Sequence, residues 1–183
     1  MQRTEMEWAR LLAAESGEHG GGVREHPPAS AWGASRSDTI DRLVWARLSD
    51  PRRLEADLPG LRLGTTGPIS SRSDDDAVEV WVDGELAAMH GLWRVARLDA
   101  NLDLRRRLFE AVAWHVEHTG TENATHRPWA AHVFLLEGSA EARLFAEGQL
   151  HACRAEGGPD PCSRWILADA ARELALASGH ARP

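Results

Sequence analysis

Apolar residues recur at helical spacing along this chain, and residues 102–118 show the pattern most clearly. At about 100° per residue, the apolar side chains of this segment fall on one side of a helix, and Arg106, Arg107 and Glu117 fall on the other. A helix with one apolar face has to bury that face against other elements. The pattern therefore predicts a helix that packs into a core. Its apolar set is Leu104, Leu108, Ala111, Val112 and Val116.

Further helical segments are separated by glycine, proline and short polar runs. They predict an all-α fold of antiparallel helical hairpins, in a single domain that covers residues 1–183. Stretches rich in small and polar residues near 17–36 and 60–76 predict mobile connections. The other predicted helices are residues 5–15, 38–48, 51–58, 128–137, 140–155 and 161–178.

Residues 77–98 fit two structures. The first few alternate as in a strand, and Asp83-Gly84 is a common hairpin-turn pair, which predicts a short β-hairpin at residues 78–89. Apolar residues that include Met89 and Trp93, however, share one face at helical spacing. The residues after the turn pair are also good helix formers. We expect a helix and keep the hairpin as the alternative.

Composition excludes several classes of function. The chain carries a formal net charge of -7 and contains no lysine and no tyrosine. Without lysine there is no Schiff-base amine and no phosphate-loop lysine. The basic charge rests on arginines scattered among acids, so we expect no nucleic-acid partner. No apolar run approaches the length of a membrane span, and two cysteines do not form a disulfide framework. We therefore expect a soluble, cytoplasmic protein.

Histidine and tryptophan are concentrated between Trp114 and Leu136, which hold four of the nine histidines and two of the eight tryptophans. A helical hairpin would bring His115 and His118, at the end of one helix, close to His126 in the following connection. Three imidazoles suit a divalent metal such as zinc, although their spacing matches no dedicated zinc motif. Burial in the core or capping of helix ends is the structural alternative for these histidines.

Glu85 is a candidate catalytic residue because it shares its predicted helix side with Trp93. A carboxylate on an apolar face is either paired or functional, since burying it alone is costly. If the two helices pack as a hairpin, Glu85 can meet His115, and the two side chains form a candidate acid–base couple. A buried ion pair of Glu85 with Arg94 or Arg127 is the alternative.

Polar and aromatic residues also surround the connection that follows residue 118. Asn123, Arg127 and Trp129 combine an amide, a guanidinium fork and a flat ring, which suit recognition of a sugar or a carboxylate. In the structural alternative, Asn123 sets a turn and Trp129 belongs to the core. The candidate ligand-binding residues are Trp93, Asn123, His126, Arg127, Trp129 and His132.

Two stretches resemble a known class of fold. The sequence Glu85-Leu-Ala-Ala-Met-His90-Gly-Leu-Trp93 and the stretch from Trp114 to His132 resemble the helical hairpins of α/α-toroid enzymes. That class includes six-hairpin glycosidases and epimerases, polysaccharide lyases and terpenoid-cyclase-like proteins. The resemblance implies a partial toroid, a dimer or a smaller helical bundle, because a complete toroid needs a longer chain. It matches no single catalytic motif, so it assigns no residue a role.

Two functional hypotheses follow. In the first, the protein is a small enzyme or binding protein for a polar or sugar-like ligand, with Glu85 and His115 at its site. In the second, it is a non-catalytic helical module that docks a partner protein or forms a homodimer. The sequence does not decide whether the protein is an enzyme.

Overall fold

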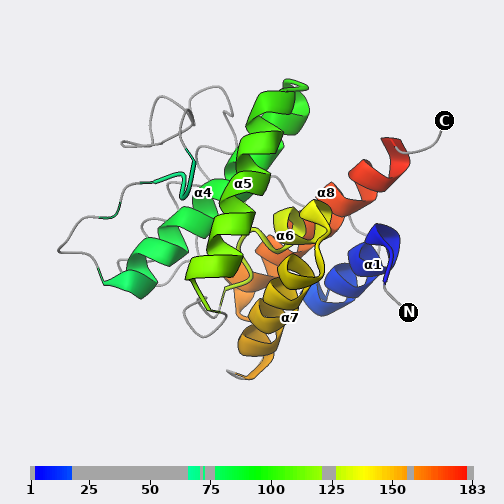
Figure 1. Ribbon diagram of the computed structural model, residues 1–183. Helices are drawn as coiled ribbons and strands as arrows, with labels where there is room; N and C mark the ends of the chain where they lie inside the picture. The colour runs from blue at the N-terminus through cyan, green and yellow to red at the C-terminus, as the bar shows by residue number, and fades with distance from the viewer. Residues whose placement is uncertain are drawn as a thin grey trace.

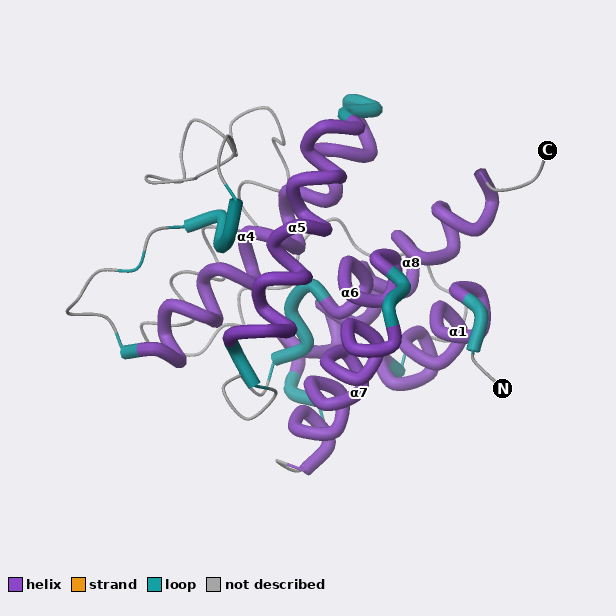
Figure 2. Tube along the Cα trace, in the orientation of Figure 1, coloured by secondary structure: helices purple, strands orange, loops and turns teal. Residues whose placement is uncertain are grey.

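The computed structural model describes residues 3–17, 66–70, 72, 77–120, 127–155 and 159–180. Within these ranges the chain forms six α-helices and no strand (Figures 1 and 2). The prediction of an all-α fold is confirmed, and the likeness to a toroid stays a prediction. The helices are α1 (Glu5–Ser16), α4 (Val78–Leu98), α5 (Leu102–His118), α6 (Ala131–Glu137), α7 (Ala140–Ala155) and α8 (Pro161–His180).

Several sequence predictions fall outside these ranges. The helices predicted at residues 38–48 and 51–58 lie wholly outside the described residues. So do the predicted mobile connections, except for Gly17, residues 66–70 and Arg72. The described residues do not test these predictions.

Val78–Leu98 form one uninterrupted helix, α4, so the alternative of a β-hairpin at residues 78–89 is wrong. The Asp83-Gly84 pair lies inside this helix. Val82, Leu86 and Met89 are fully buried on its inner side. Burial of a face at helical spacing therefore outweighs the local turn preference of Asp-Gly, because only the helix places all these apolar side chains in the core.

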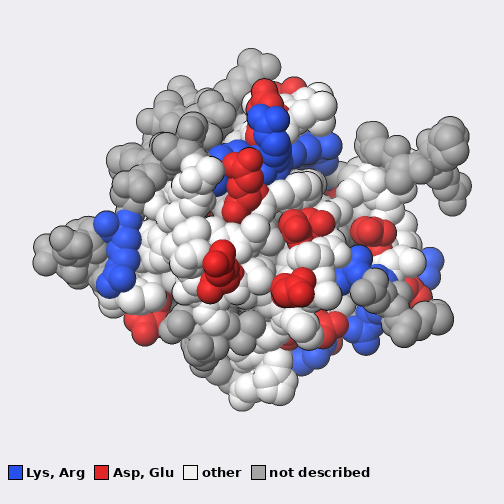
Figure 3. Space-filling view, viewed as in Figure 1, with Lys and Arg blue, Asp and Glu red and all other residues white. Residues whose placement is uncertain are grey.

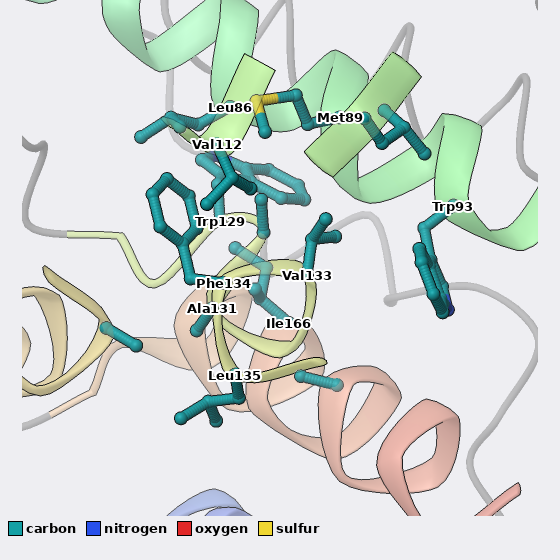
Figure 4. Close-up of a cluster of buried hydrophobic side chains, with 14 of the residues drawn as sticks. Leu86, Met89, Trp93, Val112, Trp129, Ala131, Val133, Phe134, Leu135 and Ile166 are labelled. Atoms are coloured by element: carbon teal, nitrogen blue, oxygen red, sulfur yellow. The ribbon is translucent and has the colours of Figure 1, made fainter. Parts of the chain in front are cut away.

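The short helix α6 lies at the centre of the fold and contacts α4, α5, α7 and α8. Its first five residues are all buried, which fits a helix surrounded by others. It begins at Ala131 and not at Pro128 as the sequence predicts. Ala130 just before it has φ 55°, a left-handed conformation that a helix cannot contain. Figure 4 shows Val133 and Phe134 of α6 packed with side chains from the neighbouring helices, including Trp129 from the preceding turn.

The first and last helices of the described chain lie side by side, with α1 along α8 (Figure 1). A capping box between Thr4 and Glu7 starts α1, because the side chain of each residue accepts a hydrogen bond from the other's free backbone N–H. Trp8 and Leu12 bury the inner face of this helix. Its far end is joined to α7, where Arg154 donates to Glu15 at 2.6 Å.

Charged side chains also join helices in the interior. Arg97 of α4 donates two hydrogen bonds to Glu173 of α8, at 2.6 and 2.9 Å, and Glu173 is almost fully buried. This fork-to-carboxylate geometry is the strongest form of ion pair. It fixes how α4 lies against α8.

The surface in Figure 3 mixes acidic and basic side chains, and neither sign forms a continuous field on that face. The mixture agrees with the expectation that arginines are scattered among acids. In the part of the chain that the structure describes, no helix combines the length and apolar character that a membrane span requires.

The turn between α4 and α5 yields a stability prediction. Ala100 is exposed and has φ 50°, a conformation that costs an L-residue about 1–2 kcal/mol, whereas glycine adopts it freely. Glycine also raises the entropy of the unfolded chain, by roughly 0.4–1 kcal/mol. Ala100→Gly should therefore raise the free energy of unfolding by about 0.5 kcal/mol, measured by urea denaturation.

The matched control is Ala113→Gly, at an exposed position inside α5. There glycine should destabilise the protein by about 1 kcal/mol. Equal destabilisation by both substitutions would contradict the left-handed conformation of Ala100.

Candidate functional site

Glu85 lies on α4 with its carboxylate completely buried. Residues 69–70 lie against it. The backbone N–H groups of Ile69 and Ser70 both donate to the carboxylate, the second at 2.6 Å, and the Ser70 hydroxyl donates as well. Three donors to a buried carboxylate replace the hydrogen bonds that it would make to water. Neither Arg94 nor Arg127, the two arginines named as examples of an ion-pair partner, bonds Glu85 among the described residues, and the arginine whose charge interacts with Glu85 is the buried Arg107.

His115 of α5 meets Glu85, as the two predicted helical faces suggested. Its Nε2 atom lies 3.6 Å from Glu85 Oε1, and neither side chain is exposed. The Thr119 hydroxyl donates its hydrogen to the His115 carbonyl at 2.8 Å, so it accepts from His115 Nδ1 at 3.1 Å. Nδ1 therefore carries a proton. At 3.6 Å from the carboxylate, Nε2 makes no hydrogen bond among the described residues.

A guanidinium holds the other side of the same segment. Arg107 of α5 is buried and donates to the Pro68 carbonyl at 2.9 Å. Burial lowers the pKa of Arg107, while the charges of Glu110 and Glu85 raise it. Residues 68–70 are thus bound by a cation at a carbonyl and by an anion at two N–H groups, which are charge-assisted bonds of the strong kind.

Aromatic side chains cover this Glu85–His115 couple toward the surface. Trp81 donates its indole N–H to the Ser70 hydroxyl at 3.1 Å, and its ring centre lies 6.1 Å from that of His115. Trp114 packs edge-on against Trp81 and is partly exposed. The exposed His118 ring stacks on Trp114 at 4.6 Å. The couple therefore lies beneath a partly exposed aromatic surface.

The three predicted metal ligands do not all lie beside the Glu85–His115 couple. His115 faces Glu85, whereas His118 is exposed and its Nδ1 bonds the Trp114 carbonyl at 2.9 Å. His126 lies outside the described residues, as does Asn123. Among the residues that the structure does describe, no three His, Cys, Asp or Glu side chains form a group that could hold a metal ion. Cys153 and Cys162 are both free and buried.

A second polar cluster lies deeper, where α4, α6 and α8 meet. His90 Nδ1 accepts from the backbone N–H of Ala130 at 3.2 Å, so its proton is on Nε2, which bonds Asp169 at 3.1 Å. Burial alone would raise the pKa of Asp169, but the hydrogen bond and charge of His90, with smaller help from His132 and Arg94, lower it. The bond to His90 also holds Ala130 in its left-handed conformation before α6.

His132 of α6 packs against this pair, with its ring centre 4.5 Å from that of His90. It is fully buried, and neither of its nitrogens has a hydrogen-bond partner. Burial holds the pKa of His132 well below its usual value; the nearby His90 lowers it further and Asp169 raises it. His132 is therefore a neutral imidazole in the interior.

The remaining candidates are placed as follows. Trp129 is fully buried in the core, and its carbonyl accepts from Gln149 at 3.0 Å. Arg127 is nearly buried and lies 3.8 Å from Asp160. Trp93 packs between His132 and Phe109. The structure thus groups Glu85 with His115, and Trp93 with His132, in two different places.

His90 and Asp169 are the buried polar pair that sequence reasoning missed. A signal was present in both helices. Asp169 stands within the apolar run from Ile166 to Ala171, and a lone acid in such a run implies a buried partner. His90 is four residues after Leu86 and three before Trp93, so it shares their buried side of α4. Neither signal identifies the partner, because the pairing of a histidine with an acid depends on how the helices pack.

Comparison with known proteins adds nothing to this geometry. No protein-family model, curated protein or solved structure matches the chain. Its function has to be inferred from the residues alone.

His132 predicts a loss of stability in acid. Because its pKa is lowered in the folded protein, the unfolded chain, with the ordinary histidine pKa of 6.5, takes up a proton first as the pH falls. The contribution of His132 is intact above that value and decreases below it, by up to about 1.4 kcal/mol per pH unit. Asp169, whose folded pKa is lowered from 3.8, keeps its contribution until the pH is lower still.

Urea denaturation at about pH 7.5 and about pH 5.5 measures this effect. In His132→Leu, which removes the titrating group, the difference between the two values should be smaller by about 1 kcal/mol. The same pH dependence in both proteins would show that His132 is not held neutral.

Proposed function

We propose that the protein binds a small polar or sugar-like molecule at the Glu85–His115 couple and uses these two side chains as a general acid and base. One observation carries this proposal. Glu85 Oε1 and His115 Nε2 lie 3.6 Å apart, and neither side chain is exposed. A carboxylate and an imidazole that face each other away from water are side chains of the kinds that general acid–base catalysis uses.

The surroundings support a ligand with a flat, polar surface. Trp81 and Trp114 both pack against the His115 ring, and Trp114 is partly exposed. Indole faces are a common surface for sugar rings, since they bury the apolar C–H side and leave hydroxyls free. A substrate atom reaches Glu85 only where residues 69–70 now bond its carboxylate. Binding in this proposal therefore exchanges those hydrogen bonds for bonds to the ligand.

A second candidate function rests on those same bonds. Both oxygens of Glu85 accept from residues 69–70, and Arg107 holds the carbonyl of residue 68. A carboxylate used in this way fastens one segment of the chain to α4 and needs no ligand. In that case the protein is a non-catalytic helical module that docks a partner protein or a second copy of itself.

Two finer expectations also remain proposals. A divalent metal at His115, His118 and His126 would belong to the first function, with the imidazoles as ligands. We also expect a cytoplasmic location from the composition, and this expectation is compatible with either function.

The substitutions Glu85→Gln and His115→Gln test the first function. Each removes one member of the couple and keeps roughly its size. Calorimetric titration of the purified protein with D-glucose, D-galactose and N-acetylglucosamine measures binding, and heat unfolding measures stability. We expect a sugar to bind the unmodified protein and neither variant. Each variant should also lose about 1–3 kcal/mol of stability, since a buried partner is left unpaired.

The matched control is Glu173→Gln, which breaks another buried carboxylate pair of α4. It should lower stability by a similar amount and leave sugar binding unchanged. If no sugar binds the unmodified protein, and Glu85→Gln only speeds hydrogen exchange at Ile69 and Ser70, the catalytic proposal fails. The fastening function then stands, and the mass in solution decides whether the module self-associates.

A further inference from the structure

Three helices bring together N–H groups that have no acceptor. At the junction of α4, α5 and α6, the buried Trp93 Nε1, the buried Nε of Arg105 and both nitrogens of His132 lack a hydrogen-bond partner among the described residues. Trp93 and His132 are at least nine-tenths buried, whereas Arg105 is half-buried and so connects the group to the surface. These three residues are called the donor cluster below.

The donor cluster is contiguous. The guanidinium carbon of Arg105 lies 5.6 Å from the centre of the Trp93 ring. On the other side, the Trp93 ring centre lies 6.2 Å from that of His132, with the rings nearly perpendicular. Figure 4 shows Trp93 extending from α4 to one side of the packed core residues. The unpaired groups are therefore neighbours in one place and are not scattered through the molecule.

Leaving such groups unpaired is unfavourable. A buried donor without an acceptor costs about 1–3 kcal/mol, and native proteins contain only a few of them. Here three neighbouring side chains share this deficit: Trp93 and Arg105 lack an acceptor, and His132, as a neutral imidazole, lacks both an acceptor for its N–H and a donor for its other nitrogen. A ligand with several oxygen atoms that enters beside Arg105 would provide hydrogen bonds to all three side chains at once.

The charge nearby favours an anion. The Arg105 guanidinium lies over the Trp93 ring. The Asp169 carboxylate already bonds His90, and Arg94 is among the charges that lower its pKa. Arg105 therefore brings a positive charge to the donor cluster.

We propose that the donor cluster binds a small carboxylate that carries a hydroxyl group. The Arg105 and Trp93 N–H groups donate to the carboxylate, which is the acceptor that a guanidinium fork and an indole prefer. His132, as a neutral imidazole, offers one donor and one acceptor and pairs with the hydroxyl. A carboxylate alone satisfies only part of the cluster.

This site is separate from the proposed Glu85–His115 site. Trp93 is eight residues after Glu85 on α4, which is about 12 Å along the helix. Carboxylate binding at the donor cluster does not require any chemistry at Glu85. The two proposals therefore fail or succeed independently.

The Trp93 indole N–H is a direct reporter. Its proton signal in a nitrogen-correlated NMR spectrum is identified by its loss in Trp93→Phe. Titration with L-lactate should move this signal downfield in a saturable way, because a hydrogen bond to a carboxylate deshields the proton. Propionate, which lacks the hydroxyl, should bind more weakly, and glycerol, which lacks the carboxylate, should leave the signal unchanged.

Arg105→Gln should weaken lactate binding at least tenfold, since it removes a charged hydrogen bond (about 1.5 kcal/mol or more). The control is Arg106→Gln, at the neighbouring exposed arginine that pairs with Asp103, which should bind lactate normally. Because Arg105 is only half-buried, the Arg105→Gln variant is expected to fold even if Trp93→Phe does not. The Trp93 indole signal can then be assigned as the one that lactate moves in the unmodified protein but not in Arg105→Gln.

Three results would overturn the proposal. The first is no movement of any indole signal with lactate. The second is equal movement with lactate and with sodium chloride, which would be a general effect of salt. The third is unchanged lactate binding in Arg105→Gln. Binding of glycerol as tightly as lactate would likewise show that the cluster does not recognise a carboxylate.

Discussion

The buried polar groups of α4 each need a partner from another part of the chain, and this requirement organises the fold. Glu85 binds residues 69–70 and faces His115 on α5. His90 and Arg97 bond acids on α8. A buried polar group without its partner costs more than the bond itself provides. The main effect of these pairs is therefore not added stability. They determine which segments pack against α4 and in what register.

The same pairs explain the shape of the centre. Helix α6 is too short to be stable alone, and it is buried by four neighbouring helices. Its start is set by a bond from Ala130 to His90, which holds a left-handed residue that would otherwise be strained. One histidine thereby fixes the turn before α6 and the contact of α4 with α8. Catalytic chemistry is not required to account for His90.

Much of the fold was predictable because helical periodicity is a local property. The spacing of Leu104, Leu108 and Val112 marks α5, and the pair of Thr4 with Glu7 marks the start of α1. The start of α6 was misplaced because Pro128 is a good first helical residue, whereas the bond from Ala130 to His90 comes from a residue forty positions away. Local rules have no access to such a bond.

By itself, the sequence determined the helical class and most boundaries of the described helices, since the apolar period suffices for these. It left the meeting of Glu85 with His115 conditional on the packing of the two helices. Only the tertiary structure decided that residues 69–70 bind Glu85, that His90 pairs with Asp169, and that Trp93 and His132 share a place with Arg105. Periodicity tells which face of a helix is buried. Which polar groups meet on that face depends on the packing of helices distant in sequence, and the sequence contains no local record of it.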